Sequence, residues 1–272
     1  MPDSFFVPDG DSFLSTELTR GPWDPEAQHP GPSAALIARE VERLPSDTAR
    51  MVGRITYEIL RPVPIARVWV EATVARPGRS VELVEATLRS DRAELVRARA
   101  WRLRISSLDL DGELGWDQEG SGAVLRRGYA PPGPDTGEAY DAEFFPTGQS
   151  VGYHTAMDYR FVAGEFLRPG PATVWLRMRH PLVAGEEPTP LQRVAIAADT
   201  GNGISAPLDF RRFVFINVDL TIHLGRAPVG QWVCLDSATI PDGAGLGITD
   251  TALYDEAGAL GRAAQTLLVA PR

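Results

Sequence analysis

The sequence predicts an α+β fold in which a helix followed by antiparallel strands occurs twice. Two helical stretches with apolar faces are each followed by four strand-like segments, and hairpin signals separate strands within each group. Strands and helices do not alternate, and no GxGxxG follows a strand, so a doubly wound dinucleotide-binding sheet is disfavoured. A duplicated helix-plus-sheet unit fits these observations better.

The first unit is predicted from Pro32 onward. A helix over Pro32–Leu44 carries an apolar face, and Ser33 is a plausible N-cap. An extended segment, Phe13–Pro22, precedes the helix. The turn Arg76-Pro77-Gly78-Arg79 separates two Val-rich runs. The strands are expected at roughly 51–60, 66–76, 80–90 and 93–105.

The second unit repeats this order. Its extended segment is Val174–Pro181 and its helix is Thr189–Thr200, with Thr189 as N-cap and Pro190 in the first turn. A turn at Asp255-Glu256-Ala257-Gly258 marks a hairpin near the end of the chain. The strands are expected at roughly 213–224, 230–239, 245–254 and 261–269.

Between the two units lies a stretch rich in Gly, Pro and acidic residues. Residues 109–149 show no sustained periodicity and are too many for a tight connection inside one unit. We therefore expect a linker at 109–149 between an N-terminal domain, 1–108, and a C-terminal domain, 150–272.

Composition excludes several classes of chemistry. All 27 cationic side chains are Arg, so a Schiff-base lysine, a lysine-anchored pyridoxal phosphate and a P-loop lysine are ruled out. A single cysteine, Cys234, and four scattered histidines provide no metal-ligand pattern, and we expect neither a metal nor an organic cofactor. The net charge of −9 argues against nucleic acid as a partner.

The sequence shows no basic-then-apolar leader and no apolar run of the ~18 residues that a membrane helix needs. We expect a cytoplasmic protein with a small-molecule or protein partner and no membrane association.

Short motifs in both units resemble the acyl-CoA thioesterase superfamily, in particular type II acyl-CoA thioesterase-like proteins with a double hot-dog fold. Each motif is degenerate, and their order across nearly the whole chain carries the resemblance. In the first unit the motifs are Gly31-Pro32-Ser33-Ala34-Ala35, Tyr57-Glu58-Ile59-Leu60-Arg61-Pro62 and Arg76-Pro77-Gly78-Arg79-Ser80. In the second they are Trp175-Leu176-Arg177, Ala197-Ala198-Asp199, Asn217-Val218-Asp219-Leu220-Thr221 and Gly261-Arg262-Ala263-Ala264-Gln265.

Asp199 is the first candidate catalytic residue. It lies at the edge of the apolar face of the second helix and near its C-terminal end, where the helix dipole disfavours a carboxylate. The alternative is that Asp199 only shapes the turn after the helix. The resemblance implies the catalytic role, because the family's helix-borne Asp falls on Asp199.

The strand predicted at 213–224 alternates aliphatic and mixed residues. Period-two alternation places Asn217, Asp219, Thr221 and His223 on one face, which is most simply a solvated face. The resemblance singles out Asn217, at a position where type II thioesterases use a Thr. An amide can donate to and accept from a water but does not reproduce the geometry of a hydroxyl.

Gln265 lies in the last predicted strand, before an apolar run. A buried amide there needs hydrogen-bond partners, and an outward-facing amide is the alternative. The resemblance implies that Gln265 matches the catalytic Gln of the family. Glu40 on the first helix is a weaker candidate, since a helix Glu is more often solvated or paired with Arg.

Two arginines are candidate ligands for the phosphates of coenzyme A. Arg61 precedes Pro62, and Arg226 lies in Gly225-Arg226-Ala227-Pro228.

The resemblance implies hydrolysis of a fatty acyl-CoA, with Asp199, Gln265 and Asn217 activating a water and helix-start N–H groups stabilising the oxyanion. It also implies a homodimer. Two alternatives remain: a non-catalytic protein that binds acyl-CoA or an acyl carrier, which the Asn at 217 favours, and an enoyl-CoA hydratase or dehydratase, whose Asn-Pro-aliphatic-His signature is missing.

Overall fold

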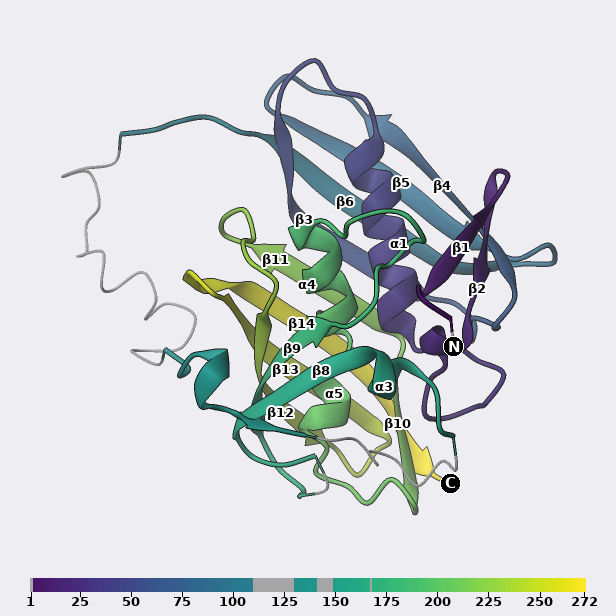
Figure 1. Cartoon of the computed structure of the whole chain (residues 1–272), viewed down its shortest axis with the longest axis vertical. Helices are drawn as coiled ribbons and strands as arrows, with labels where there is room; N and C mark the ends of the chain where they lie inside the picture. Colours follow the sequence, from purple (N-terminus) through teal and green to yellow (C-terminus); the bar gives the residue numbers. More distant parts are fainter. Residues whose placement is uncertain (1, 110–129, 141–148, 167) are drawn as a thin grey trace.

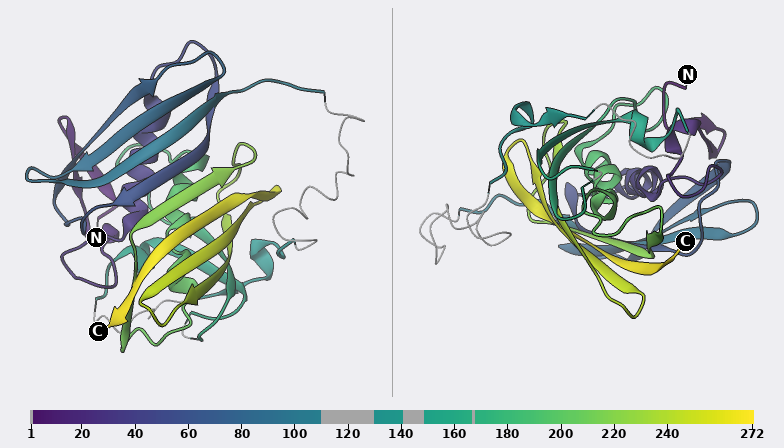
Figure 2. Two further views of the ribbon diagram at one scale, coloured as in Figure 1. Left: turned by 180° about the vertical axis from the view of Figure 1, so that it is seen from behind. Right: turned by 90° about the horizontal axis from the view of Figure 1, so that it is seen from below.

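Two helices lie side by side inside one strongly curved antiparallel sheet (Figures 1 and 2). The computed structural model describes residues 2–109, 130–140, 149–166 and 168–272. The helices are α1 (Pro30–Arg43) and α4 (Pro190–Ala198), one from each half of the chain. The view from below in Figure 2 shows both helices end-on with the strands wrapped around them. The predicted α+β arrangement of helices wrapped by a sheet is confirmed.

The first half forms the four strands that the sequence predicts and two more. Strands β1 (Phe6–Asp9) and β2 (Ser12–Ser15) form a hairpin, and the 3-10 turn η1 (Glu17–Thr19) leads toward α1. The N-cap of α1 is His29 rather than Ser33, because the helix starts at Pro30 and His29 accepts from the backbone N–H of Gly31. The long strands are β3 (Arg50–Ile59), β4 (Arg67–Arg76), β5 (Val81–Arg89) and β6 (Glu94–Arg104).

The second half places its helix as predicted, with Thr189 as the N-cap of α4. A single turn, α5 (Gly201–Ile204), follows α4, and another, α3 (Tyr153–Ala156), precedes the strands. The hairpin at Asp255-Glu256-Ala257-Gly258 is confirmed. The strands of this half are β8 (Met157–Ala163), β9 (Ala172–Met178), β10 (Phe213–Asn217), β11 (Asp219–Leu224), β12 (Val233–Pro241), β13 (Leu246–Asp255) and β14 (Gly258–Pro271).

The two halves share one sheet because β3 pairs with β11 at its centre. Thr56 on β3 faces Thr221 on β11, and their hydroxyl oxygens are 3.1 Å apart. The strand order is β1-β2-β4-β5-β6-β3-β11-β14-β13-β12-β9-β8-β7, with β10 pairing to β14. The short strand β7 (Glu138–Ala139) forms the far edge.

The strand predicted at 213–224 is two strands, and the prediction of one continuous polar face is wrong. The strand is interrupted at Val218, and the pairing register against β14 shifts by one residue there. Since side chains alternate along a strand, one extra residue reverses the buried face. Asn217 is buried before the break, whereas Thr221 and His223 beyond it do not join it in the interior.

Only part of the predicted linker lies within the described residues. Residues 130–140 include a 3-10 turn, η2 (Pro134–Thr136), and the edge strand β7. The indole N–H of Trp175 donates to the carbonyl of Pro132 over 2.8 Å. This end of the predicted linker therefore packs on the outer face of the C-terminal sheet. Residues 110–129 and 141–148 lie outside the described residues.

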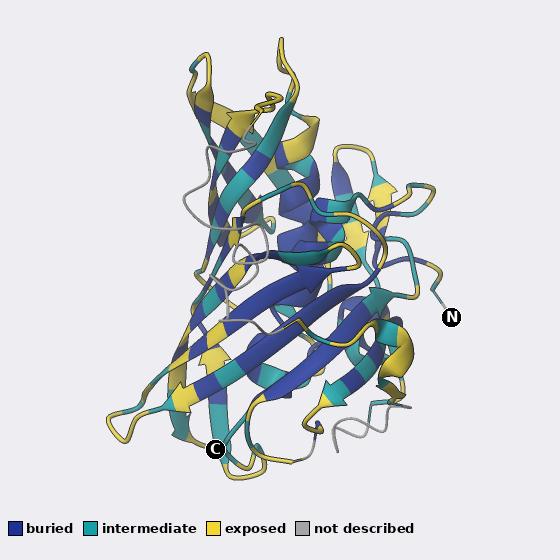
Figure 3. Ribbon diagram, turned by 90° about the vertical axis from the view of Figure 1, so that its left-hand side faces the viewer, coloured by how far each residue is buried: buried dark blue, intermediate teal, exposed yellow. Residues whose placement is uncertain are grey.

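Apolar side chains from the helices and the concave face of the sheet form the main core. In Figure 3 buried residues occupy the middle of the strands and the helices behind them, and exposed residues gather at strand ends and loops. The helices approach closely where α1 begins: a Cβ on Gly31 would lie 2.5 Å from the carbonyl oxygen of Ile196 on α4. No helix of the described residues is long and apolar enough to cross a membrane.

Substitution of Gly31 tests this contact. Gly31→Ala should lower the free energy of unfolding by about 1–3 kcal/mol, because the new methyl group meets backbone that cannot rotate away. Urea denaturation followed by circular dichroism measures the change. Gly203→Ala is the matched control, since a Cβ there meets nothing within 4 Å and alanine favours a helix. Equal stabilities of the two variants would contradict the close approach.

Candidate active site

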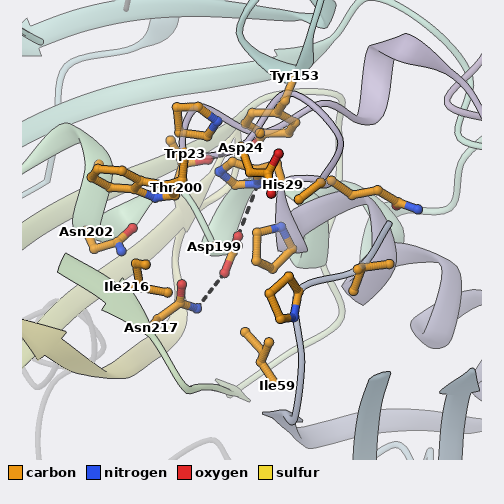
Figure 4. Close-up of a pocket in the computed structure, with 18 of the residues that line it drawn as sticks. Trp23, Asp24, His29, Ile59, Tyr153, Asp199, Thr200, Asn202, Ile216 and Asn217 are labelled. Carbon is orange, nitrogen blue, oxygen red and sulfur yellow. Dashed lines mark hydrogen bonds and ion pairs between the residues drawn. The ribbon is translucent and has the colours of Figure 1, made fainter. Parts of the chain in front are cut away.

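The carboxylate of Asp199 lies where three segments from the C-terminal half meet. Asp199 is the C-cap of α4 and is 1% exposed. The side-chain amide of Asn217 donates to its Oδ1 over 2.8 Å. The amide of Gln265 donates to its backbone oxygen over 3.1 Å and approaches Oδ1 at 3.4 Å. The three residues that the resemblance selected are therefore neighbours, and Figure 4 shows Asn217 pointing at Asp199.

Local backbone geometry fixes both amides. Asn217 is the last residue of β10 before the break at Val218, which turns its side chain inward toward the helix end. Gln265 comes from β14, and its Oε1 accepts from the backbone N–H of Asn202 over 3.1 Å. The amide of Asn217 also donates to the carbonyl of Asp219 over 3.2 Å. Because each amide has a second partner, its N–H stays directed at Asp199.

His29 is a member of this cluster that the sequence analysis did not identify. Its Nδ1 lies 3.1 Å from the Oδ2 of Asp199 and 3.1 Å from the backbone nitrogen of Gly31. Its ring stacks on Tyr153 with centroids 3.9 Å apart. The Tyr153 hydroxyl bonds the carbonyl of Ile196 on α4 and the hydroxyl of Thr200 just beyond it, each at 2.8 Å. The available signal was the position of His29 just before Pro30 and Gly31, which a search for metal ligands overlooks.

Burial shifts the pKa of Asp199 and that of His29 in opposite directions. Desolvation raises the pKa of Asp199 to about 6, against hydrogen bonds from Asn217, Gly31 and Gln265 that lower it. Desolvation lowers the pKa of His29 to about 3. Near neutral pH the pair therefore consists of an ionised Asp199 and a neutral His29. In the tautomer with its proton on Nδ1, the imidazole donates to Oδ2, which has no other hydrogen-bond partner among the described residues, and Nδ1 then no longer accepts from Gly31.

The two shifts have opposing effects on stability. A raised carboxyl pKa removes stability as the pH rises through about 6, and a lowered histidine pKa adds stability as the pH rises above about 3. Between about pH 4 and 6 the unfolded pair holds its one proton on histidine, and the folded pair holds one on Asp199. The proton count is equal in both states, so the pair contributes little pH dependence of stability in this range.

Asp199 opens onto a cavity of about 470 Å³ that is bounded by both halves of the chain. Aliphatic and aromatic side chains make up much of its wall, and Figure 4 shows Trp23 and Tyr153 above the carboxylate. Trp23 packs edge-on against Phe215 with centroids 5.2 Å apart. The aromatic lining consists of Trp23, Tyr153, Tyr159, Phe166 and Phe215, and three arginines also contribute, namely Arg20, Arg61 and Arg272. The cavity suits a ligand with an apolar part and an anionic part.

The structure separates the two arginines that the sequence proposed as phosphate ligands. Arg61 is exposed and lines this cavity. Arg226 does not line it, because its guanidinium pairs with both carboxylate oxygens of Asp255, at 2.5 and 2.6 Å. Glu40, the weaker candidate, forms an ion pair with Arg39 instead.

The described residues contain no group of three or more His, Cys, Asp or Glu side chains that could hold a metal ion. Cys234 is buried in β12, and burial raises the pKa of its thiol well above its ordinary value, so it lacks the character of a nucleophile.

Comparison with solved structures supports the fold. A protein of unknown function with a hot dog fold from Alicyclobacillus acidocaldarius is 14% identical, with a TM-score of 0.69 over 98% of this chain and 95% of that one. A thioesterase II candidate from Thermobifida fusca YX is 18% identical, with a TM-score of 0.72 over 98% and 96%. An acyl-CoA thioesterase II from Mycobacterium marinum is 14% identical, with a TM-score of 0.63 over 97% and 94%. The chain thus has the predicted double hot-dog fold.

Sequence models of a family cover most of the chain. Residues 19–103 match the acyl-CoA thioesterase N-terminal domain, and residues 133–269 match the acyl-CoA thioesterase C-terminal domain. No curated protein matches the sequence significantly. The two consecutive domain matches, in the order that the fold requires, show that the chain belongs to the acyl-CoA thioesterase family.

Proposed function

We propose that this protein hydrolyses a fatty acyl-CoA to the free acid and CoA, with Asp199 as the general base. The observation that carries the proposal is a buried carboxylate of raised pKa at the wall of an aromatic cavity, held by two side-chain amides. A base whose pKa lies near 6 is largely ionised at neutral pH and is a better proton acceptor than an ordinary Asp. Family membership supports the same chemistry.

The proposed reaction follows from these groups. Asp199 accepts a proton from a water that Asn217 and Gln265 help to orient, and the water oxygen attacks the thioester carbonyl. The tetrahedral intermediate collapses, the carbon–sulfur bond breaks, and the proton held by Asp199 returns to the CoA sulfur. The atoms balance without a metal or an organic cofactor.

The first turn of α1 limits the backbone donors for the oxyanion. Its first three residues are Pro30, Gly31 and Pro32, so Gly31 supplies the single N–H among them. This N–H is already engaged by His29 and Asp199, so we assign it to holding the base rather than to the oxyanion.

The cavity suggests how the substrate lies. The aromatic walls would enclose the acyl chain beside Asp199, and Arg61, Arg20 and Arg272 would meet the phosphates of CoA. Arg226 does not take this role, because its guanidinium is already paired with Asp255.

Asn217 also supports a second candidate, a protein that binds acyl-CoA without cleaving it. The hydroxyl expected at this position is missing, and its amide donates to Asp199 and to the carbonyl of Asp219, at 2.8 and 3.2 Å. Tight binding of acyl-CoA without CoA release would identify this function.

Asp199→Asn should abolish most of the hydrolysis and leave the fold intact. Loss of the base should lower kcat by about 10²–10⁴-fold, because the amide cannot accept the proton. CoA release is followed with a thiol reagent across short-, medium- and long-chain acyl-CoAs. Glu40→Gln, a neutralised carboxylate outside the cavity, is the control and should retain activity. Unchanged release in Asp199→Asn would refute the assignment of the base.

The pH profile tests the link between His29 and Asp199. For the wild type, kcat/KM should rise as the pH is raised through about 6, because only ionised Asp199 accepts a proton. His29→Phe keeps a ring beside Tyr153 but removes the donor to Oδ2, so ionised Asp199 loses stabilisation and the rising limb should move about one pH unit upward. His29→Asn places an amide near the Nδ1 position and should restore the limb. A profile identical in all three proteins would exclude the coupling.

We further propose a homodimer, and the cytoplasmic location stays a prediction. Apolar side chains that are more than a third exposed pair across neighbouring strands of the sheet: Leu268 faces Leu246, and Ile248 faces Ile240. Such exposed apolar pairs are typical of an interaction surface.

Light scattering of wild type and Leu268→Arg measures the mass in solution. We expect a dimer for the wild type and a monomer for the variant, because a charge would be buried in the interface. A monomeric wild type, or a dimer that the arginine leaves intact, would contradict the proposed surface.

A further inference from the structure

The fold contains an internal twofold relation centred on the pairing of Thr56 with Thr221. Each strand of this pair has a one-residue register break three residues earlier, at Gly53 in β3 and at Val218 before β11. The two halves can therefore be superposed residue by residue along these strands. Val52, immediately before one break, corresponds to Asn217, immediately before the other.

The two helices are also related in this way, because an acid at the C-terminal end of each contacts the N-cap of the other. Asp199 at the end of α4 contacts His29, the N-cap of α1. Glu42 near the end of α1 contacts Thr189, the N-cap of α4, whose hydroxyl donates to Oε2 over 2.7 Å. In the first half, Glu42 rather than Glu40 therefore makes the contact that Asp199 makes in the second, although Glu42 lies three residues further along its helix.

A second pocket, of about 500 Å³, lies at this other pair of helix ends. Glu42, Val52 and Pro190 line it, as Asp199, Asn217 and Pro30 line the first cavity. The second pocket is therefore the internal counterpart of the proposed active site.

The second pocket has no amide side chain at the strand positions that correspond to Asn217 and Gln265. Val52 holds the place of Asn217. Val52 pairs with Arg102 as Asn217 pairs with Leu267, so Ala100, two residues before Arg102, holds the place of Gln265. Neither valine nor alanine can orient a water through its side chain, and hydrolysis of the proposed kind is not supported there.

The second pocket has instead two arginines at positions that hold apolar residues in the second half of the chain. Arg50 corresponds to Phe215, and Arg102 corresponds to Leu267. Both arginine side chains are less than a tenth exposed, and both face a single buried acid, Glu82. The Nε of Arg102 lies 2.7 Å and that of Arg50 3.5 Å from its carboxylate oxygens.

The two guanidinium groups and Glu82 carry one positive charge in excess between them, before Glu42 of the same pocket is counted. Within the part of the chain that the structure describes, no other carboxylate lies within 4.0 Å of either guanidinium, and Nη1 of Arg50 is buried without a partner. Glu42 is held by Thr189 and Gln192. Nε and Nη2 of Arg50 and Nη1 of Arg102 already donate to Ser46 and to backbone carbonyls. Since a buried donor is costly unless it is paired, the free Nη1 of Arg50 is the group suited to an anion.

We propose that the second pocket binds an aliphatic monocarboxylate, with its head group at Arg50 and Arg102. The other lining residues give a hydrocarbon tail its contacts, which a simple inorganic anion would not use; they include Leu44, Met51, Ile105, Leu191 and Leu224. The reaction proposed above releases an acid of this class, so the pocket would be a product site, and this last step rests on the proposed function. The binding itself does not.

Calorimetric titration with octanoate, without any acyl-CoA, tests the site separately from hydrolysis. The wild type should bind octanoate at the second pocket whether or not the first cavity also takes it. Arg50→Met should lose one binding site or weaken it at least tenfold, because Glu82 and Arg102 then form a neutral pair. Arg92→Met, which removes an exposed arginine outside both pockets, is the charge-matched control and should bind like the wild type.

A second variant and two other ligands test the site even if Arg50→Met folds poorly. Glu82→Gln increases the excess positive charge and should tighten octanoate binding severalfold, which a general loss of structure would not do. Octan-1-ol should bind more weakly than octanoate, and inorganic phosphate should as well. Equal octanoate binding by wild type and Arg50→Met would overturn the site. Octan-1-ol binding as tightly as octanoate would overturn the role of the charge, and phosphate binding as tightly would overturn the role of the tail.

Discussion

The buried carboxylate of Asp199 is the constraint on which the rest of the site depends. A carboxylate with 1% exposure at a helix C-terminus faces both desolvation and an unfavourable dipole. Its position is tolerable only because donors from separate segments converge on it: Asn217 from β10, Gln265 from β14, and His29 at the start of α1. Each donor has its own packing requirement, so one acid determines the geometry of several elements.

Two of these requirements concern the backbone. The helices must approach closely enough for His29 to reach Asp199, and this places Gly31 against the carbonyl of Ile196. Asn217 must face inward while β11 keeps its aliphatic residues in the core, and the register break at Val218 permits both. Without the break, an inward Asn217 would turn Leu220 and Ile222 toward solvent. The one extra residue, Val218, therefore lets Asn217 face Asp199 while Leu220 and Ile222 stay in the core.

Regular features of the fold could be predicted from the sequence. Both helices, the long strands of the first half and the hairpin turns depend on local periodicity and turn residues, which a single sequence displays. The break at Val218 could not be predicted, because the alternation from Phe213 to Leu224 continues through it without a Gly or Pro. His29 and Arg226 were misjudged for a related reason: their partners, Asp199 and Asp255, are distant in the chain and come close only in the fold.

The two halves show how one scaffold supports opposite electrostatic environments. The second half places the amides of Asn217 and Gln265 around an acid, and the corresponding strand positions of the first half hold Val52 and Ala100. The first half then substitutes Arg50 and Arg102 for the residues equivalent to Phe215 and Leu267. The one-residue register break beside the central strand pair occurs in both. Because the fold is specified by the backbone pairing and the apolar face, the side chains at the break are free to differ, and they determine whether the pocket presents a base or a positive charge to its ligand.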